Sequence, residues 1–256
     1  MNYLSHQTEF GETFNSKLEE LEKNLENIYD IRKKSESDGE TRSIRLHSST
    51  LDSKSTFACI KAILENKITM GTLVESYENF YSQYLGGSHK ALSCNSGSSA
   101  NLLAISTLIQ SSKLKKGDKV IVPALSWSTT IFPLVQYGLI PIFCDCNDFD
   151  FNISLKNFQI LIEKYQPKAL MLIHTYGCPA DMDQICKITK EKKMVLIEDT
   201  CESMGAEWDN QKAGTFGNVS TFSSYYSHHI CTLEGGLTCF RDSSDLMIAE
   251  SIRSHG

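Results

Sequence analysis

The chain has 256 residues, and 25 Lys and Arg against 31 Asp and Glu give it a formal net charge of −6. Apolar residues make up 41% and charged residues 22%, a composition typical of folded globular proteins and not of disordered chains. There is no run of about 18 apolar residues, which a membrane-spanning helix needs, and no basic stripe of the kind that nucleic-acid binders carry. We therefore expect neither a membrane nor a nucleic-acid partner.

The beginning of the chain indicates its compartment, and the cysteine spacing bears on zinc binding. Residues 1–30 are polar and rich in charge, without the basic and apolar segments of a secretory leader, so the expected compartment is the cytoplasm. None of the nine cysteines forms a CxxC pair, so the spacing of a zinc ribbon is absent. We interpret most of them as small buried side chains.

Residues 1–50 are predicted to form a helical arm followed by a linker. Apolar side chains recur there at three- and four-residue spacing among Glu and Lys, as in an amphipathic helix: Leu18, Leu21, Leu25, Ile28 and Ile31. The polar stretch KKSESDGETRS at residues 33–43 predicts the linker. The helix fits either packing on its own domain or a role as an oligomerisation arm.

Residues 51–256 alternate between helical and strand patterns and are expected to form one domain. Helices are predicted at 53–65, 72–84, 154–165 and 181–192, and after residue 97. Strands are predicted at 91–93, 120–122, 140–146, 168–177 and 194–200. Apolar strands separated by helices indicate βαβ units and an α/β fold with a mostly parallel sheet. Ligands bind such sheets at the carboxyl ends of the strands, so the residues that follow each strand are the candidates for a site.

Small polar residues follow the first strand, where SGSS opens a helix. Backbone N–H groups at a helix N-terminus attract anions, so Gly97 and Ser98 are candidates for a phosphate cradle. A plain helix cap explains the same residues, and the segment has neither P-loop nor GxGxxG spacing. After the second strand, Trp127 either stacks on a planar ligand or belongs to the core.

An acidic pair, Glu198 and Asp199, ends the strand at 194–200. Burying such a pair is costly unless something uses it. One carboxylate could hold the protonated ring nitrogen of pyridoxal phosphate (PLP). The alternative is a metal carboxylate, although no histidine stands beside the pair in the sequence. Further on, His228 and His229 precede Glu234, and neighbouring residues of a strand point to opposite faces, so we expect at most one histidine to face a site.

Several motifs recur in an order that resembles one family. They are NSGSSANLL, GDKVIVPALSWSTT, GLIPIFCD, HTYGCPADMD, LIEDTCESMGA, AGTFG and EGG. Together, over about residues 68–256, they resemble the DegT/DnrJ/StrS family of sugar-modifying, fold-type I PLP-dependent enzymes. The resemblance implies the three-layer α/β/α large domain of that fold, in a homodimer with shared active sites. It also implies that the small C-terminal domain of the family is missing from these 256 residues.

The resemblance assigns six residues to the cofactor: Gly97, Ser98, Trp127, Asp199, Glu202 and Ser223. Gly97, Ser98 and Ser223 match positions that hold the cofactor phosphate. Trp127 matches the residue stacked on the pyridine ring, and Asp199 matches the carboxylate paired with the ring nitrogen. Glu202 stands where most aminotransferases of the family carry Gln beside the cofactor.

One departure from the family pattern decides the expected reaction. The aminotransferases carry a Schiff-base lysine six residues before the Glu of the EGG-type motif, and here that residue is His228. The last lysine of the chain is Lys212, so none stands nearby to replace it. The replacement resembles the deoxysugar 3-dehydratases of the family. It implies that L-glutamate converts noncovalently held PLP to pyridoxamine phosphate (PMP). His228 then acts as catalytic base in the 3-dehydration of a nucleotide-linked 4-keto-6-deoxyhexose, in O-antigen or lipopolysaccharide deoxysugar synthesis.

Three alternatives stay open on the sequence. A nucleotide-sugar aminotransferase would need a lysine from elsewhere. An iron–sulfur 3-dehydrase of the family shares the histidine and uses a cysteine near Cys201 with further cysteines downstream, but the ending RSHG resembles the cluster-free type more. The chain could also be an inactive, truncated remnant.

Overall fold

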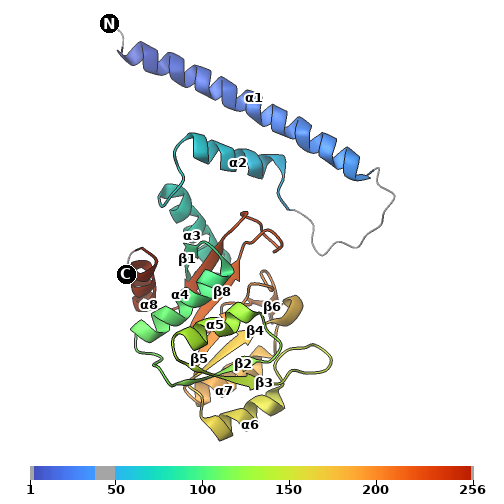
Figure 1. Cartoon of the computed structure of the whole chain (residues 1–256), viewed down its shortest axis with the longest axis vertical. Helices are drawn as coiled ribbons and strands as arrows, with labels where there is room; N and C mark the ends of the chain where they lie inside the picture. Colours follow the sequence, from blue (N-terminus) through green and yellow to red (C-terminus); the bar gives the residue numbers. More distant parts are fainter. Residues whose placement is uncertain (1–2, 38–49, 255–256) are drawn as a thin grey trace. The chain divides into compact units, whose positions relative to one another are not determined.

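The computed structural model describes residues 3–37 and 50–254 and divides the chain into two units, Met1–Leu73 and Val74–Gly256 (Figure 1). The first unit contains α1 (Tyr3–Ser37) and α2 (Ser53–Leu64). The Tyr29 hydroxyl hydrogen-bonds the Thr56 hydroxyl at 2.6 Å and joins the two helices. Asp52 caps α2 by accepting a hydrogen bond from the Ser55 N–H.

The N-terminal helix extends further than its apolar pattern predicted. The linker expected at 33–43 is wrong for residues 33–37, which continue α1 because Lys and Glu are good helix formers. Its remaining residues, 38–43, lie outside the described part of the chain. The predicted domain boundary at residue 50 lies within the first unit and stays a prediction.

The second unit is built on a seven-stranded sheet with the order β1-β9-β8-β5-β4-β2-β3. Its strands are β1 (Lys90–Cys94), β2 (Lys119–Pro123), β3 (Ile140–Cys144), β4 (Ala169–Ile173), β5 (Val195–Asp199), β8 (Val219–Ser223) and β9 (Gly236–Phe240). Strands β3, β2, β4, β5 and β8 pair in parallel, and β9 runs antiparallel to both of its neighbours. The predicted mostly parallel sheet is therefore confirmed. A separate hairpin joins β6 (Glu207–Trp208) to β7 (Gln211–Lys212).

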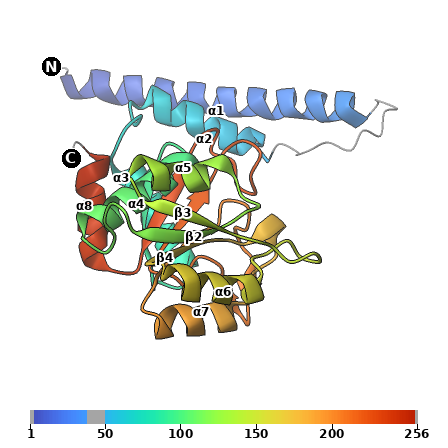
Figure 2. The same ribbon diagram turned by 60° about the horizontal axis from the view of Figure 1, so that its bottom comes forward.

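Helices cover both faces of this sheet, which confirms the three-layer α/β/α fold. The helices are α3 (Thr72–Tyr84), α4 (Gly97–Gln110), α5 (Ser128–Gln136), α6 (Leu155–Tyr165), α7 (Met182–Glu191) and α8 (Ser243–Arg253), with a 3₁₀ turn, η1 (Thr175–Gly177). Side chains of α4, α5 and α8 pack on one face, and those of α6 and α7 pack on the other (Figure 2). Side chains alternate between the two faces along β5, which explains the division. Ile197 packs with α4, α5 and α8, and its neighbour Leu196 packs with α6 and α7.

Two local expectations change in the structure. His228 and His229 lie in the loop between β8 and β9 and not in a strand, so strand alternation does not govern where they point. Helix α5 had no predicted counterpart, because Pro133 lies inside it and proline usually ends a helix. Within residues 3–37 and 50–254, no helix is both long and apolar enough to cross a membrane.

Candidate active site

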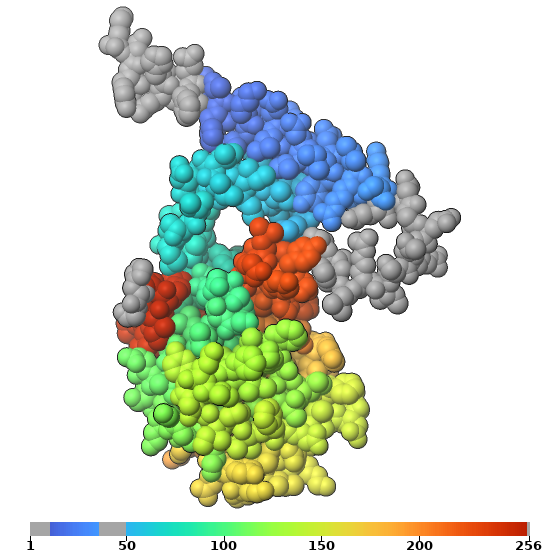
Figure 3. All heavy atoms as spheres, in the orientation of Figure 1, coloured from blue at the N-terminus to red at the C-terminus, as the bar shows by residue number. Residues whose placement is uncertain are grey.

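The carboxyl ends of the parallel strands bring together segments that are far apart in the sequence. The chain leaves β5 at Asp199 and β8 at Ser223, on neighbouring strands. The segment after β1 enters α4 at Gly97, and the segment after β2 reaches α5 through Trp127. In Figure 3 the loop between β8 and β9, in orange-red, lies on the same face of the second unit as α4 and α5, in green.

The N-terminus of α4 forms a cradle closed by two other strand ends. Ser96 caps the helix, its hydroxyl accepting from the Ser99 N–H at 3.1 Å. A Cβ atom on Gly97 would lie 2.7 Å from Ser223 Cβ and 2.9 Å from Cys201 Sγ, so only glycine allows this approach. Ser98 is exposed, and its hydroxyl donates to the Thr129 hydroxyl at 3.1 Å. First-turn N–H groups have no partner within a helix, so the cradle can receive an anion such as a phosphate.

The Asp199 carboxyl is buried at the end of β5 and held by three neutral donors. Its Oδ2 accepts from Asn101 Nδ2 at 2.9 Å and from the Thr130 hydroxyl at 2.8 Å, and its Oδ1 accepts from the Cys201 N–H at 3.2 Å. Thr221 donates to Asn101 Oδ1 and fixes the orientation of that amide. No Lys, Arg or His in the described residues pairs with Asp199. A cationic ring nitrogen would supply the missing positive charge.

Trp127 and Glu202 belong to the two segments that meet at this carboxyl through Thr130 and Asp199. Trp127 immediately precedes α5 and is 68% exposed, so its ring is free to cover a planar ligand and is not a core side chain. Glu202 lies three residues after Asp199 and is only partly open to solvent. Partial burial, and then the charge of Asp199, raise the pKa of Glu202. Glu202 is therefore protonated at a higher pH than an isolated glutamate.

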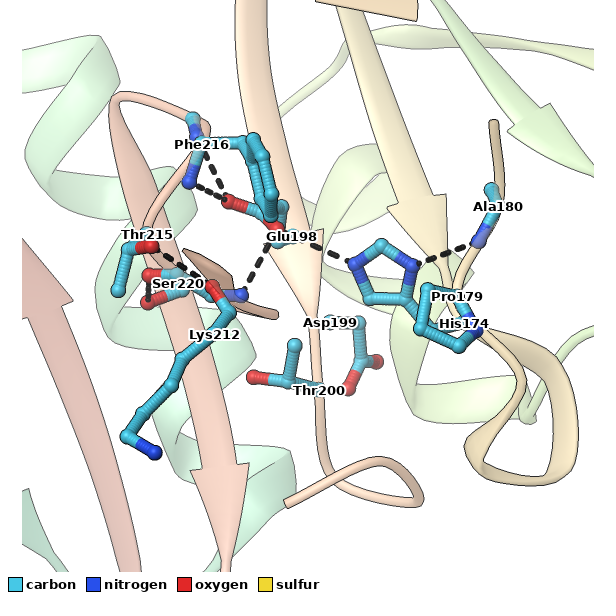
Figure 4. Close-up of polar contacts among 12 residues, drawn as sticks. His174, Pro179, Ala180, Glu198, Asp199, Thr200, Lys212, Thr215, Phe216 and Ser220 are labelled. Carbon is cyan, nitrogen blue, oxygen red and sulfur yellow. Dashed lines mark hydrogen bonds and ion pairs between the residues drawn. The ribbon is translucent and has the colours of Figure 1, made fainter. Parts of the chain in front are cut away.

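The second member of the acidic pair, Glu198, points to the opposite face of the sheet (Figure 4). Its carboxylate accepts from the N–H groups of Gly214, Phe216 and Gly217 and from His174 Nε2, at 2.6–3.1 Å. His174 Nδ1 accepts from the Ala180 N–H, which leaves Nε2 to donate to Glu198. Burial raises the pKa of Glu198, but the hydrogen bond and charge of His174, together with the backbone N–H groups of Gly217 and Gly214, outweigh burial and lower the pKa.

This geometry argues against the metal alternative for the acidic pair. Glu198 and Asp199 face different layers and cannot ligate one ion. In residues 3–37 and 50–254, no group of three or more His, Cys, Asp and Glu could hold a metal. Burial, and then the charge of Asp199, raise the pKa of the Cys201 thiol, which packs beneath the cradle as a neutral side chain.

His228 lies in the loop between β8 and β9, half-buried. The loop is closed at its base by hydrogen bonds from Ser224 N–H to Gly235 O and from Thr232 N–H to Ser224 O. The His228 ring meets Tyr225 edge to face, and no described side chain hydrogen-bonds the imidazole. Partial burial and the neighbouring His229 lower the pKa of His228, while Asp199 acts in the opposite direction. The imidazole is thus a neutral base at pH 7 in the electrostatic range of Asp199.

Two of the six predicted cofactor residues, Gly97 and Ser223, are in direct contact, and hydrogen bonds join Ser98 and Asp199 to α5. Glu202 and His228 are related to Asp199 through charge and not through a hydrogen bond. Sequence reasoning gave no role to Asn101 or Thr130, which orient Asp199. Both stand in the motifs NSGSSANLL and SWSTT, but their shared partner is 98 and 69 residues away.

Comparison with known proteins decides the family. The model of the DegT/DnrJ/EryC1/StrS aminotransferase family matches residues 50–256. The chain belongs to this family. A GDP-4-keto-6-deoxy-D-mannose 3-dehydratase from Yersinia pseudotuberculosis is 44% identical over 213 residues, covering 82% of this chain and 54% of the relative.

Solved structures also resemble the chain. Two of a GDP-4-keto-6-deoxymannose-3-dehydratase have a TM-score of 0.79 and 42% identity, and cover 84% of this chain and 55% of theirs. One contains a trapped PLP–glutamate geminal diamine. The other is a His-to-Asn variant with bound GDP-perosamine. The chain thus spans about half the length of the relatives it matches.

Proposed function

We propose that the protein catalyses the PLP- and PMP-dependent 3-dehydration of a nucleotide-linked 4-keto-6-deoxyhexose in deoxysugar biosynthesis, with L-glutamate as amino donor. One observation supports the proposal: His228, which the resemblance places at the family's lysine position, lies in the loop that follows Ser223, the residue that Gly97 approaches closely, and it interacts through charge with Asp199. Lys212, the last lysine of the chain, pairs with Glu207 at 2.8 Å and lies over the Tyr84 ring. A lysine for a Schiff base is therefore lacking in this segment.

The residues present fit pyridoxal phosphate. The Gly97 cradle is too close to Ser223 for any side chain, which leaves backbone N–H groups and the hydroxyls of Ser98 and Ser223 to bind a phosphate. Asp199, held only by neutral donors, is suited to keep a pyridine nitrogen protonated. Trp127 is exposed at the start of the helix that carries Thr130 and is suited to stack on the ring. We assign cofactor binding to these residues and to Glu202.

When bound, the cofactor in its amine form supplies an electron sink at C4 of the sugar. His228 would move the protons: its neutral imidazole would take a proton from the carbon that carries the cofactor's amine and, as imidazolium, would donate a proton to the C3 hydroxyl, which leaves as water. The lowered pKa of His228 favours proton removal, because the neutral imidazole then predominates at neutral pH. An imidazole cannot capture the cofactor covalently as lysine does, so the amine stays free to react with the sugar.

Relatives support the choice of substrates. The relative from Yersinia pseudotuberculosis is named as a dehydratase of a GDP-linked 4-keto-6-deoxy sugar. The solved structures hold a glutamate adduct of PLP in one case and GDP-perosamine in the other. A GDP-linked sugar and L-glutamate are therefore the first substrates to test on this chain.

We also propose a cytoplasmic homodimer. Sugar nucleotides and PLP are cytoplasmic metabolites, which supports the compartment. Apolar side chains of α5 and of the edge strand β3 are open to solvent, and Phe132, Val135 and Phe143 are each more than half exposed. Such a surface is suited to a second copy of the chain. Sedimentation of the unaltered chain and of a Phe132→Glu variant tests it: a dimer that the variant breaks supports the assignment, and a monomer in both refutes it.

One experiment tests the proposed reaction. The purified chain is mixed with PLP, its absorbance spectrum is recorded before and after L-glutamate, and a borohydride-treated sample is weighed by intact mass spectrometry. We expect PLP to bind, glutamate to convert it to the PMP spectrum, and borohydride to leave no adduct. An adduct on one lysine would indicate an ordinary aminotransferase. A chain that binds no PLP would be an inactive remnant, and iron in the preparation would indicate the iron–sulfur type.

A further inference from the structure

The turn η1 after β4 carries an unusual residue, Tyr176. Its backbone is left-handed, with φ 52° and ψ 30°, which bulky side chains rarely adopt. Its side chain is 76% exposed and makes no hydrogen bond or ring contact within the described residues. Neither packing nor a hydrogen bond of the tyrosine itself therefore accounts for this conformation.

The structure around the turn holds it from both sides. Asn152 is buried, accepts from the Thr175 N–H at 3.0 Å and donates to Cys178 O at 3.1 Å. His174 connects the start of the turn to Glu198 and to the Ala180 N–H beyond it (Figure 4). Strained residues persist where their surroundings over-determine the backbone, and they cluster at ligand sites.

The position of the turn relates it to the proposed site. Strand β4 lies between β5 and β2, so η1 emerges between the Asp199–Glu202 segment and the segment that carries Trp127. The turn approaches the Asp199–Glu202 segment closely, because a Cβ atom added to Gly177 would lie 3.7 Å from the Glu202 carbonyl oxygen. An unpartnered aromatic side chain thus stands at the carboxyl edge next to a residue assigned to the cofactor.

We propose that Tyr176 contacts the bound nucleotide sugar, its ring packing against the C–H face of the sugar between Trp127 and Glu202. This inference rests on the function proposed above. The ring supplies apolar contact area at low entropic cost, because only two side-chain torsions are ordered. The ring is 76% exposed at this edge, where a substrate above the cofactor would meet it.

The test uses the PLP-loaded chain, with GDP-perosamine as the probe in isothermal titration calorimetry. Tyr176→Asn removes the ring and keeps a residue that tolerates the left-handed region, so the fold should persist. We expect about tenfold weaker GDP-perosamine binding, with PLP affinity unchanged and no fall in melting temperature. Tyr176→Phe keeps the ring and should retain most of the affinity.

A matched control separates substrate contact from backbone strain. Gln166 is also left-handed, with φ 47°, but it caps α6 at the amino edge of the sheet. Gln166→Asn should leave GDP-perosamine binding unchanged. Unaltered sugar affinity in Tyr176→Asn, or a loss that accompanies a change of oligomeric state, overturns the inference.

The glutamate-dependent spectrum of the unaltered chain, recorded in the same series, separates the two proposals. If that spectrum appears and GDP-perosamine does not bind, the Tyr176 inference fails and the cofactor assignment stands. If the spectrum does not appear, the proposed function fails and the inference fails with it.

Discussion

Replacing Asp199 by Asn tests the centre of the site. The carboxylate has two acceptor atoms, and the structure uses both: Oδ2 serves Asn101 and Thr130, and Oδ1 serves the Cys201 N–H. An amide offers a single acceptor oxygen. If that oxygen takes the Oδ2 place, the NH₂ group faces the Cys201 N–H, and one donor is left without a partner. An unsatisfied buried donor costs about 1–3 kcal/mol.

Two magnitudes follow from this geometry. Without cofactor, the free energy of unfolding should fall by about 1–3 kcal/mol, which lowers the melting temperature by roughly 2–4 °C per kcal/mol in a domain of this size. With cofactor, the charge-assisted bond to the ring nitrogen is lost as well. Such a bond is worth about 1.5–3 kcal/mol, so PLP should bind roughly ten- to hundredfold more weakly. Titration of PLP by absorbance and thermal unfolding of the apo-protein measure the two effects separately.

Asp145 provides a matched control. It directly follows β3, is exposed, and accepts a hydrogen bond from the N–H of the next residue at 2.9 Å, whereas Asp199 accepts from the N–H two residues on. Asp145→Asn should leave PLP affinity unchanged. If Asp199→Asn binds PLP within about twofold of the unaltered chain, the assignment of Asp199 to the ring nitrogen is refuted.

Three further predictions concern the cradle, the base and the buried glutamate. Gly97→Ala places a Cβ 2.7 Å from Ser223 Cβ and should cost about 1–3 kcal/mol of stability and abolish tight PLP binding. His228→Asn should bind PLP and complete the glutamate step but lose dehydration, and in the unaltered enzyme kcat/KM should fall as the pH drops below the lowered pKa of His228, under 6.5. Glu198→Gln should cost about 2–4 kcal/mol in urea unfolding at pH 7, because an NH₂ group then faces backbone donors.

Each has a control or a contradicting outcome. For the cradle, wild-type PLP affinity in the alanine variant would show that the phosphate binds elsewhere. For the base, His229→Ala removes a neighbour that lowers the pKa, so the acid limb should move toward pH 6.5, and an unmoved limb argues against His228. For Glu198 the folded pKa is below 4.5, so its stabilisation exists above pH 4.5 and is lost below it. The difference from the Gln variant must shrink on acidification, and a constant difference contradicts the reasoning.

The candidate site was predictable where local sequence carries the signal. Small residues at the start of a helix and an acid at the end of an apolar strand are local patterns, and they placed Gly97 and Asp199 at the carboxyl edge. The strand assumed for His228 was wrong because the polar run from Ser224 lacks alternation and folds as a loop closed by Thr232.

The partners of these residues were not predictable in the same way. His174 binds Glu198 from the residue that follows β4, 24 residues earlier, so the sequence around the acidic pair does not reveal this contact. Asn101 and Thr130 converge on Asp199 from two helices that precede its strand. These contacts depend on which strands are neighbours in the sheet.

The sequence by itself determined the alternation of strands and helices, the helix caps and the ordered motifs that identify the family, because periodicity and capping act over a few residues. Only the tertiary structure decided that Asp199 faces α4 and α5 while Glu198 faces the opposite layer, and that η1 lies between Trp127 and Glu202. The physical reason is strand order: β4 lies between β5 and β2, and this order arises from burying both faces of one sheet at once.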